Sequence, residues 1–487
     1  MLFNSYSYIL LFLPITFFVY YALNKWHYVL AGRAFLVMAS LFFYSWWNPL
    51  YLPFLLFSIL VNYAIGTALL NEKEGRIKPK FLLIFGIMLN LGFLGYFKYA
   101  DFFISNVNIL FKTNFNLLKI VLPLAISFFT FQQIAYLADS YKKETKEYDF
   151  LNYSLFVCFF PQLIAGPIVH HMEMMPQFAN KRNLIKNYKN IALGFFIFSL
   201  GLFKKSVIAD YFANFANNGY EAANTLNFVE GWVTSLSYTF QLYFDFSGYT
   251  DMAIGSALLF NIKLPLNFNS PYKALNIQDF WRRWHMTLSR WLKDYLYIPL
   301  GGNRKGRVRG YMNLFITFLL GGLWHGAAWT FVVWGAMHGF ATVLYKVWHS
   351  LGFKLPKLIA WFITFMFINI TWIFFRADNL TQAKSILKAM LGMQGFRVPR
   401  KLGFLADVFP KIDVQVGDML GNIYKNSPLN VFLIFFAIFI IVFILNNSNE
   451  LKEKFKPTIK YQIFNSIVLV VGLMSLVKVS EFLYFNF

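Results

Sequence analysis

Two histidines lie in stretches where the residue types indicate chemistry. His325 lies in the apolar run "LFITFLLGGLWHGAAWTFVVWG". Ionisable groups inside such runs are costly and by default indicate a functional site. A neutral imidazole accepts a proton near neutral pH, which suits a general base, whereas a histidine that only bonds a neighbouring helix is the alternative. Small residues around it allow close helix approach or leave room for a substrate: Gly321, Gly322, Gly326, Ala327 and Ala328.

The second histidine, His285, belongs to "DFWRRWHMTLSRWLKDYLYIPLGGNRKGR". Asn276 and Asp279 favour a helix start, and Pro299 ends the pattern. A helical wheel places one apolar arc on Trp281, Trp284, Leu288, Trp291, Leu292 and Tyr295. This predicts a continuous amphipathic helix in the membrane interface, with tryptophans at the headgroups. His285 lies at the edge of that arc and is expected to face the protein or the membrane.

The opposite arc is basic and includes Arg282, Arg283 and Arg290. Guanidinium groups form charge-assisted hydrogen bonds with phosphates, so this face is a candidate site for a phosphorylated donor. Anionic lipid is an equally good partner for the same charges.

Further polar residues interrupt the apolar stretch "FQLYFDFSGYTDMAIGS", among them Gln241, Asp245 and Asp251. These side chains either orient a histidine or tie helices together, and we favour the second role. Asn267 lies in the loop "LPLNFNSPY" before the basic helix. His338 does not share the helix face of His325 and is the weaker candidate.

Several kinds of chemistry are excluded. The seven histidines show no H-x-x-x-H or H-E-x-x-H pair, so no metal site is expected. The single cysteine, Cys158, excludes an intramolecular disulfide and a cysteine-based metal cage. No G-x-S-x-G motif marks a serine hydrolase.

The elements that position these residues are membrane helices. The chain has 487 residues, of which 58% are hydrophobic and 14% charged, against about 25% charged in soluble domains. Its net charge of +22 fits basic loops facing anionic lipid better than nucleic acid. Apolar runs of bilayer length predict segments near 7–24, 33–47, 53–70, 81–97, 119–138, 151–168, 190–208, 229–247, 310–328, 330–347, 357–375, 429–446 and 461–484.

Charge placement predicts the orientation. The N-terminus is uncharged, while Lys25 and Arg33 follow the first segment, which places the N-terminus outside. Pro161 and Gly166 predict that 151–168 is broken and re-entrant. Residues 263–309 then lie on the cytoplasmic face and the C-terminus lies outside. The polar stretch 392–428 is long enough for a small extramembrane cap.

These motifs resemble the membrane-bound O-acyltransferase (MBOAT) family almost end to end. The resemblance rests on "LPLAISFFTFQQIAYLADSY", "FPQLIAGPI", "YFDFSGYTDMAIGSALLFNIKLPLNFNSPY", "FWRRWHMTLSRWLKDYLYIPLGGNR", "GLWHGAAWTFVVWG" and "ITWIFFRADNLTQA". The similar bacterial group contains the membrane components for alginate acetylation, peptidoglycan O-acetylation and D-alanyl transfer. "FFRADNLTQA" and the extra C-terminal helices favour the acetylase branch.

The resemblance implies an all-α polytopic fold, a ring of about 11–13 transmembrane helices around a funnel-like core with re-entrant segments and a cytoplasmic amphipathic helix. It divides the chain into N-terminal helices (1–118), a catalytic core (119–375) and a C-terminal loop with two helices (376–487). His325 matches the family's invariant histidine and His285 its second motif histidine, so both are expected to be catalytic. Trp324 joins the arginines as a candidate for donor binding, and Gln241, Asp245, Asp251 and Asn267 are candidates for polar support.

The function so implied is transfer of an acetyl group from a cytoplasmic thioester, such as acetyl-CoA, across the bacterial inner membrane. The acceptor is expected to be a periplasmic SGNH-type O-acetyltransferase, with no bound cofactor. Peptidoglycan is the favoured polymer, because a Lys-, Asn-, Ile- and Phe-rich composition indicates an AT-rich genome, to which alginate is less suited. Alginate or another exopolysaccharide remains an alternative, as does a non-catalytic transporter or scaffold.

Overall fold

The computed structural model describes the chain except for residues 72–77, 146–148, 400–412, 425–427, 477–481 and 484–487. Within the described part, five helices are long and apolar enough to cross a membrane, or six if a bent pair counts as one span. The five are Ser7–Lys25, Pro49–Leu70, Pro79–Phe111, Tyr188–Glu221 and Lys357–Arg376. The protein is therefore an all-α polytopic membrane protein, as the sequence predicts.

The N-terminal region consists of hydrophobic helices. They are α1 (Leu13–Lys25, preceded by a π-helical turn Ser7–Phe12), α2 (Val29–Ser45), α3 (Leu52–Leu70, after a 3-10 turn Pro49–Tyr51), α4 (Pro79–Leu94), a π-helical turn Gly95–Tyr99 and α5 (Ala100–Phe111). The segment expected from residue 119 becomes helical only at Ile126. Lys119 and Ala125 have positive φ angles there, which a right-handed helix does not allow.

The middle of the chain continues with α6 (Ile126–Tyr141), α7 (Phe150–Cys158), α8 (Phe160–Leu163), α9 (His171–Ala179), a 3-10 turn Lys181–Leu184, α10 (Tyr188–Phe203), a π-helical turn Lys204–Ala209, α11 (Asp210–Glu221) and α12 (Phe228–Leu259). The helix breaks at Phe159, just before Pro161, and every residue from 152 to 170 is buried. The break expected from Pro161 therefore lies inside protein, where broken backbone can be tolerated at membrane depth.

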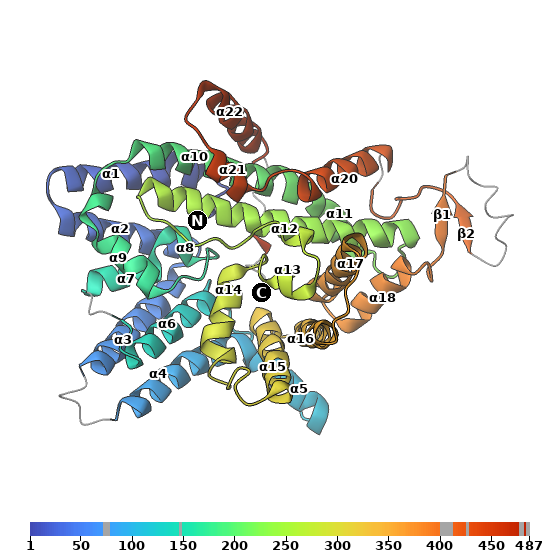
Figure 1. Ribbon diagram of the computed structural model, residues 1–487, viewed down its shortest axis with the longest axis horizontal. Helices are drawn as coiled ribbons and strands as arrows, with labels where there is room; N and C mark the ends of the chain where they lie inside the picture. The colour runs from blue at the N-terminus through green and yellow to red at the C-terminus, as the bar shows by residue number, and fades with distance from the viewer. Residues whose placement is uncertain (72–77, 146–148, 400–412, 425–427, 477–481, 484–487) are drawn as a thin grey trace.

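Helix α12 crosses the middle of the molecule, with α10 and α11 along it (Figure 1). It begins at a capping box formed by Asn227 and Glu230. Glycines allow α10 to touch it, because a Cβ on Gly201 would lie 2.5 Å from the carbonyl oxygen of Gly248. At 32 residues, α12 is longer than the expected segment 229–247.

The region that carries both histidines comprises a 3-10 turn Pro271–Lys273, α13 (Ile277–Trp281), α14 (Met286–Leu292), a π-helical turn Lys293–Tyr297, α15 (Arg307–His325), α16 (Trp329–Ser350), α17 (Lys357–Arg376) and α18 (Leu380–Met390). Helices α15 and α16 cross closely because Gly322 and Gly335 face each other. A Cβ on Gly322 would lie 2.8 Å from the Cα of Gly335.

The C-terminal region packs back onto α10 and its π-helical turn. It contains the parallel pair β1 (Phe396–Val398) and β2 (Val414–Val416), then α20 (Pro428–Phe443), α21 (Ser448–Lys454) and α22 (Ile459–Met474). The Ser206 hydroxyl donates to the carbonyl of Gly472, which ties α22 to the core. The strands project at one end of the molecule, in the stretch expected to form a small cap (Figure 1).

Candidate active site

His325 is the last residue of α15, and its side chain is buried among aromatic rings. The residue is 4% exposed. Its imidazole lies edge-on to the rings of Trp324, Trp334 and Phe375, with centroid distances of 4.9, 5.2 and 5.1 Å. The backbone leaves the helix in an extended conformation at Gly326. The apolar run therefore presents one ionisable group, at the end of a helix and deep in the protein.

A cavity of about 240 Å³ ends at His325. Its inner part is apolar and includes Trp281, Trp334 and Gly321, the glycine expected to leave room for a substrate. Arg282 and Lys293, which are exposed, line its other part together with Lys346. The cavity thus connects a basic surface with a buried imidazole.

A second cavity, of about 340 Å³, lies against the turn that follows His325. It is lined by Gly326, Ala327, Ala328 and Phe331 together with Lys98, Asp101 and neighbouring residues of 96–122. No residue lines both cavities. Two adjacent residues, His325 and Gly326, therefore line two different cavities.

His285 is fully buried and is held by Asn267. Its Nδ1 lies 3.2 Å from Asn267 Oδ1. The same oxygen accepts from the backbone N–H and the hydroxyl of Thr287 at 3.3 and 2.8 Å. Because an N–H donor fixes this atom as the amide oxygen, neutral His285 carries its proton on Nδ1 and presents Nε2 as an acceptor.

The prediction of one continuous amphipathic helix around His285 is wrong. Asn276 does cap a helix start, accepting from the N–H of Asp279, but α13 ends at Trp281. His285 adopts a left-handed backbone conformation with φ of 43°, which interrupts a right-handed helix before α14 begins. The N–H of Met286 is bonded to the carbonyl of Asn267 instead of to a helical partner.

The tryptophans of this segment pack inside the protein, not at lipid headgroups. Trp281, Trp284 and Trp291 are all buried. Trp291 stacks on Phe131 with a centroid distance of 3.6 Å and donates to its carbonyl oxygen. Trp324 also stacks on Phe131, and its ring centroid lies 4.9 Å from that of His325 and 6.5 Å from that of His285. It is absent from the lining of the basic cavity.

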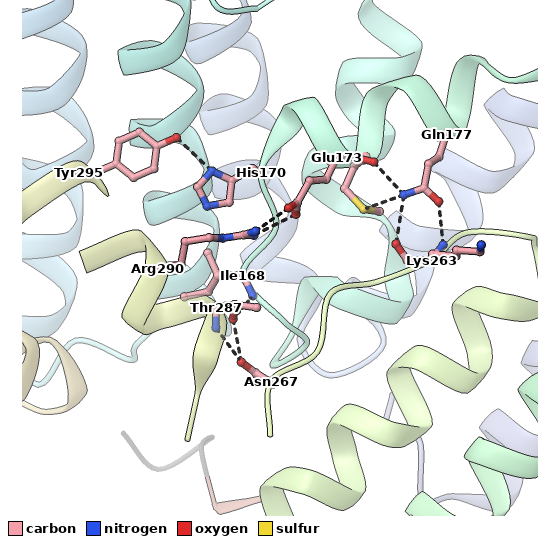
Figure 2. Close-up of polar contacts among 10 residues, drawn as sticks. Ile168, His170, Glu173, Gln177, Lys263, Asn267, Thr287, Arg290 and Tyr295 are labelled. Carbon is pink, nitrogen blue, oxygen red and sulfur yellow. Dashed lines mark hydrogen bonds and ion pairs between the residues drawn. The ribbon is translucent and has the colours of Figure 1, made fainter. Parts of the chain in front are cut away.

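Two of the three arginines expected at a phosphate are engaged with carboxylates. Arg290 forms a bidentate ion pair with Glu173, and Arg283 lies 3.0 Å from Asp279. Only Arg282 lines the cavity. Figure 2 shows how the contact of Arg290 with Glu173 ties α14 to α9, next to the hydrogen bond from the N–H of Ile168 to Thr287.

The polar residues of α12 tie helices together. Lys205 Nζ lies 2.7 Å from Asp245 and 2.9 Å from Asp210, and Lys204 Nζ lies 2.7 Å from Asp251. Asp245 and Asp251 thus pair with lysines of the π-helical turn after α10. Gln241 is buried, and within the described part of the chain its Oε1 has no hydrogen-bond partner.

Lys98 was not expected at the site, because the predicted segment ended at residue 97. Its ammonium group donates to the carbonyl oxygens of Trp324 and His325 at 2.6 and 3.1 Å. A signal was present in "LGFLGYFKYADFF", since a lysine inside an apolar stretch indicates function.

Fold and site together define a class: a multi-pass helical membrane protein with a buried imidazole between two cavities. The MBOAT, membrane-bound O-acyltransferase, family model matches residues 139–377, which include both histidines. The chain is 47% identical to the peptidoglycan O-acetyltransferase of Helicobacter pylori, over 100% of this chain and 98% of the relative. The chain therefore belongs to the membrane-bound O-acyltransferase family.

Two further relatives define its branch. A probable alginate O-acetylase of Pseudomonas aeruginosa is 39% identical over 80% of this chain and 75% of its own. The teichoic acid D-alanyltransferase of Bacillus subtilis is 30% identical over 50% of this chain and 66% of its own. The chain is an O-acyltransferase enzyme, and its similarity extends furthest within the acetylase branch, as the C-terminal helices indicated.

Proposed function

We propose that the protein takes an acetyl group from a cytoplasmic thioester and passes it across the inner membrane for O-acetylation of peptidoglycan. The main support for this reaction is one cavity, which is lined by Arg282, Lys293 and Lys346 and also by His325. The polymer is proposed from the relative that is 47% identical over the whole chain. The placement of lysines and arginines along the sequence supports a cytoplasmic position for the basic end of the cavity.

The size of the cavity supports a long, jointed donor. A volume of about 240 Å³ is below the roughly 300–1,000 Å³ that encloses a whole drug-sized ligand. An acyl group on a narrow thioester arm fits the apolar inner part. The phosphates of a donor such as acetyl-CoA then meet the basic side chains at the entrance, where charge-assisted hydrogen bonds form.

In the proposed reaction, His325 acts as the general base. An acceptor hydroxyl, entering by the cavity at Gly326, attacks the thioester carbonyl and gives its proton to the imidazole. The carbon–sulfur bond breaks, the thiolate leaves and takes up that proton, and the acceptor becomes an acetyl ester. The acceptor hydroxyl is supplied by a periplasmic SGNH-type acetyltransferase, which delivers the acetyl group to the polymer.

His285 is the second histidine of the proposal. It does not line the donor cavity, but it lies close enough to His325 for an electrostatic interaction. Asn267 orients it with Nε2 as acceptor. We assign it to proton handling beside His325, not to the donor entrance.

The test uses His325→Ala and His325→Gln in a strain that lacks the chromosomal copy. We expect base-labile acetate on murein to disappear while the membrane abundance of the tagged protein stays at the wild-type level. Wild-type acetate in both variants would overturn the proposal. Loss of acetate from an exopolysaccharide in place of murein would assign the polymer to the alginate-like alternative.

Purified protein separates catalysis from transport. We expect it to release thiol from an acetyl thioester when a hydroxyl acceptor is present, and to lose this reaction in His325→Ala. No thiol release above a protein-free control would indicate a carrier or scaffold, and release that does not depend on His325 would move the catalysis to another residue.

A further inference from the structure

Helix α15 ends without a backbone cap. Its last residue is His325, and Gly326 follows in an extended conformation with φ of −161°. The last four carbonyl groups of an α-helix have no partner inside the helix. An extended residue after the helix supplies none of the turn hydrogen bonds that usually satisfy them.

Side chains from a distant segment cap the helix instead. The hydroxyl of Tyr99 donates to the carbonyl oxygen of Leu323 at 2.8 Å. Lys98 Nζ donates to the next two carbonyl oxygens, those of Trp324 at 2.6 Å and His325 at 3.1 Å. Both side chains come from the π-helical turn Gly95–Tyr99 between α4 and α5. Three successive carbonyls, ending with that of His325, are therefore held by two adjacent residues.

The donors of Lys98 are used up within the protein. An ammonium group has three N–H donors, and the third reaches Ser127 Oγ at 3.3 Å. Lys98 therefore has no remaining donor with which to bind a substrate. Its contacts indicate a role that acts through the backbone of His325.

The charge of Lys98 matches the end of the helix. Within the described residues, the hydrogen-bond partners of Lys98 are a hydroxyl and two carbonyl oxygens, and the nearby Asp101 accepts from the N–H groups of Leu118 and Lys119 instead. The carbonyl end of a helix carries a partial negative charge, which favours a cation there. A lysine in an apolar span is costly unless it has such a partner.

We propose that Lys98, supported by Tyr99, is the positioning residue of His325. The pair holds the turn from Trp324 to Gly326, which aims the imidazole into the donor cavity and forms the partition to the second cavity. This inference rests on the proposed function of His325. A displacement of about 1 Å at a reacting group can lower a rate by roughly 100-fold, so loss of the cap is expected to affect turnover more than donor binding.

The test compares Lys98→Met, Lys98→Arg and Tyr99→Phe in the purified protein with an acetyl thioester as donor. We expect Lys98→Met to lower kcat by about 100-fold with KM for the donor changed by less than about threefold. Lys98→Arg keeps N–H donors near the carbonyls and is expected to restore most of kcat. Lys80→Met, at an exposed position in the same span, is the matched control and is expected to behave as wild type.

Two results would overturn the inference: a wild-type kcat in Lys98→Met, or a loss of kcat that Lys98→Arg does not restore. If Lys98→Met fails to accumulate, Tyr99→Phe decides, because it removes a single hydroxyl. A roughly tenfold lower kcat with unchanged melting temperature supports the cap, and an unchanged kcat refutes it. An inactive His325→Ala beside a fully active Lys98→Met would refute positioning and leave the proposed function intact.

Discussion

The indole N–H of Trp281 donates to His338 Nδ1 at 3.2 Å, while His338 Nε2 lies 3.2 Å from Thr371 Oγ1. The Thr371 hydroxyl donates its own proton to the carbonyl of Ile368, so it accepts from His338. His338 is therefore neutral, with its proton on Nε2 and both nitrogens engaged. It supports Trp281, which lines the donor cavity.

Replacing His338 is expected to deform the cavity without removing the chemistry. His338→Phe leaves the buried indole N–H of Trp281 without an acceptor, which costs about 1–3 kcal/mol of stability. We expect a lower melting temperature in detergent and a higher donor KM, while kcat stays measurable. His338→Gln, which can still accept from Trp281, should be milder. Inactivity equal to that of His325→Ala would instead make His338 a reacting group.

Asn267 controls the orientation of His285. Asn267→Ala removes the acceptor of three buried donors and should lower kcat by roughly 10- to 100-fold. Asn267→Asp keeps an oxygen at that place and should retain more activity. Steady-state kinetics on matched amounts of protein provide the check. An equal loss of kcat in both variants would show that the acceptor oxygen of Asn267 does not determine the activity.

The basic entrance predicts a donor-specific defect. Arg282→Ala should raise KM for acetyl-CoA about 3- to 30-fold, because it removes one charge-assisted contact, and should leave kcat unchanged. A short acetyl thioester without phosphates should be used equally well by variant and wild type. Arg283→Ala is the control, because Arg283 already pairs with Asp279. If Arg282→Ala raised KM for the short thioester by a similar factor, this would contradict a contact between Arg282 and the donor phosphates.

The buried ion pairs predict a stability defect. Lys205→Met leaves Asp245 and Asp210 without their cation, which typically costs about 3–5 kcal/mol. We expect low abundance and a depressed melting temperature. Lys189→Met, exposed on the same span, should have no effect. If Lys205→Met melts like wild type, these pairs do not hold α12 to its neighbour.

A pH dependence follows from His170. Its Nδ1 lies 3.1 Å from Tyr295 Oη (Figure 2). Because the Tyr295 hydroxyl donates its proton to Asp139, His170 is the donor in this hydrogen bond. Burial and the nearby Arg290 lower the pKa of His170 below its usual 6.5. A pKa lower in the folded than in the unfolded state gives stability that is present above about pH 6.5 and is lost as the pH falls below it.

His170→Asn tests this dependence, because its amide can donate to Tyr295 but does not titrate. Melting temperatures measured from pH 7.5 down to 5.0 should fall for the wild type and fall less for the variant. Parallel curves would assign the acid sensitivity to other groups.

Local signals in the sequence predicted the apolar membrane helices and the helix break near Pro161. Hydropathy placed the span Lys357–Arg376 to within a residue or two, because apolar composition over that length is itself the cause of insertion. Pro161 predicted the break after α7, since proline removes a backbone donor locally. His325 was predicted to be a site residue because it is ionisable and lies in an apolar run, and it remains a prediction.

Tertiary contacts account for what was missed. The left-handed turn at His285 depends on Asn267, which holds it from another segment. Arg290 finds its carboxylate at Glu173, 117 residues away in sequence. Lys98 acts on carbonyls more than 200 residues away, and no periodicity within either segment encodes such a pairing.

The partition between the two cavities has an electrical consequence. The rings of His325, Trp334, Phe331 and Phe375 pack edge to face there, with centroid distances of about 5 Å. An ion crossing a bilayer gains or loses about 2.3 kcal/mol per charge for every 100 mV of membrane potential. In the proposed reaction the acetyl group crosses this wall toward the acceptor, and the proton of the acceptor hydroxyl crosses in the opposite direction to the thiolate, so no net charge crosses. The rate of acetyl export is then expected to be independent of the membrane potential, and export does not dissipate that potential.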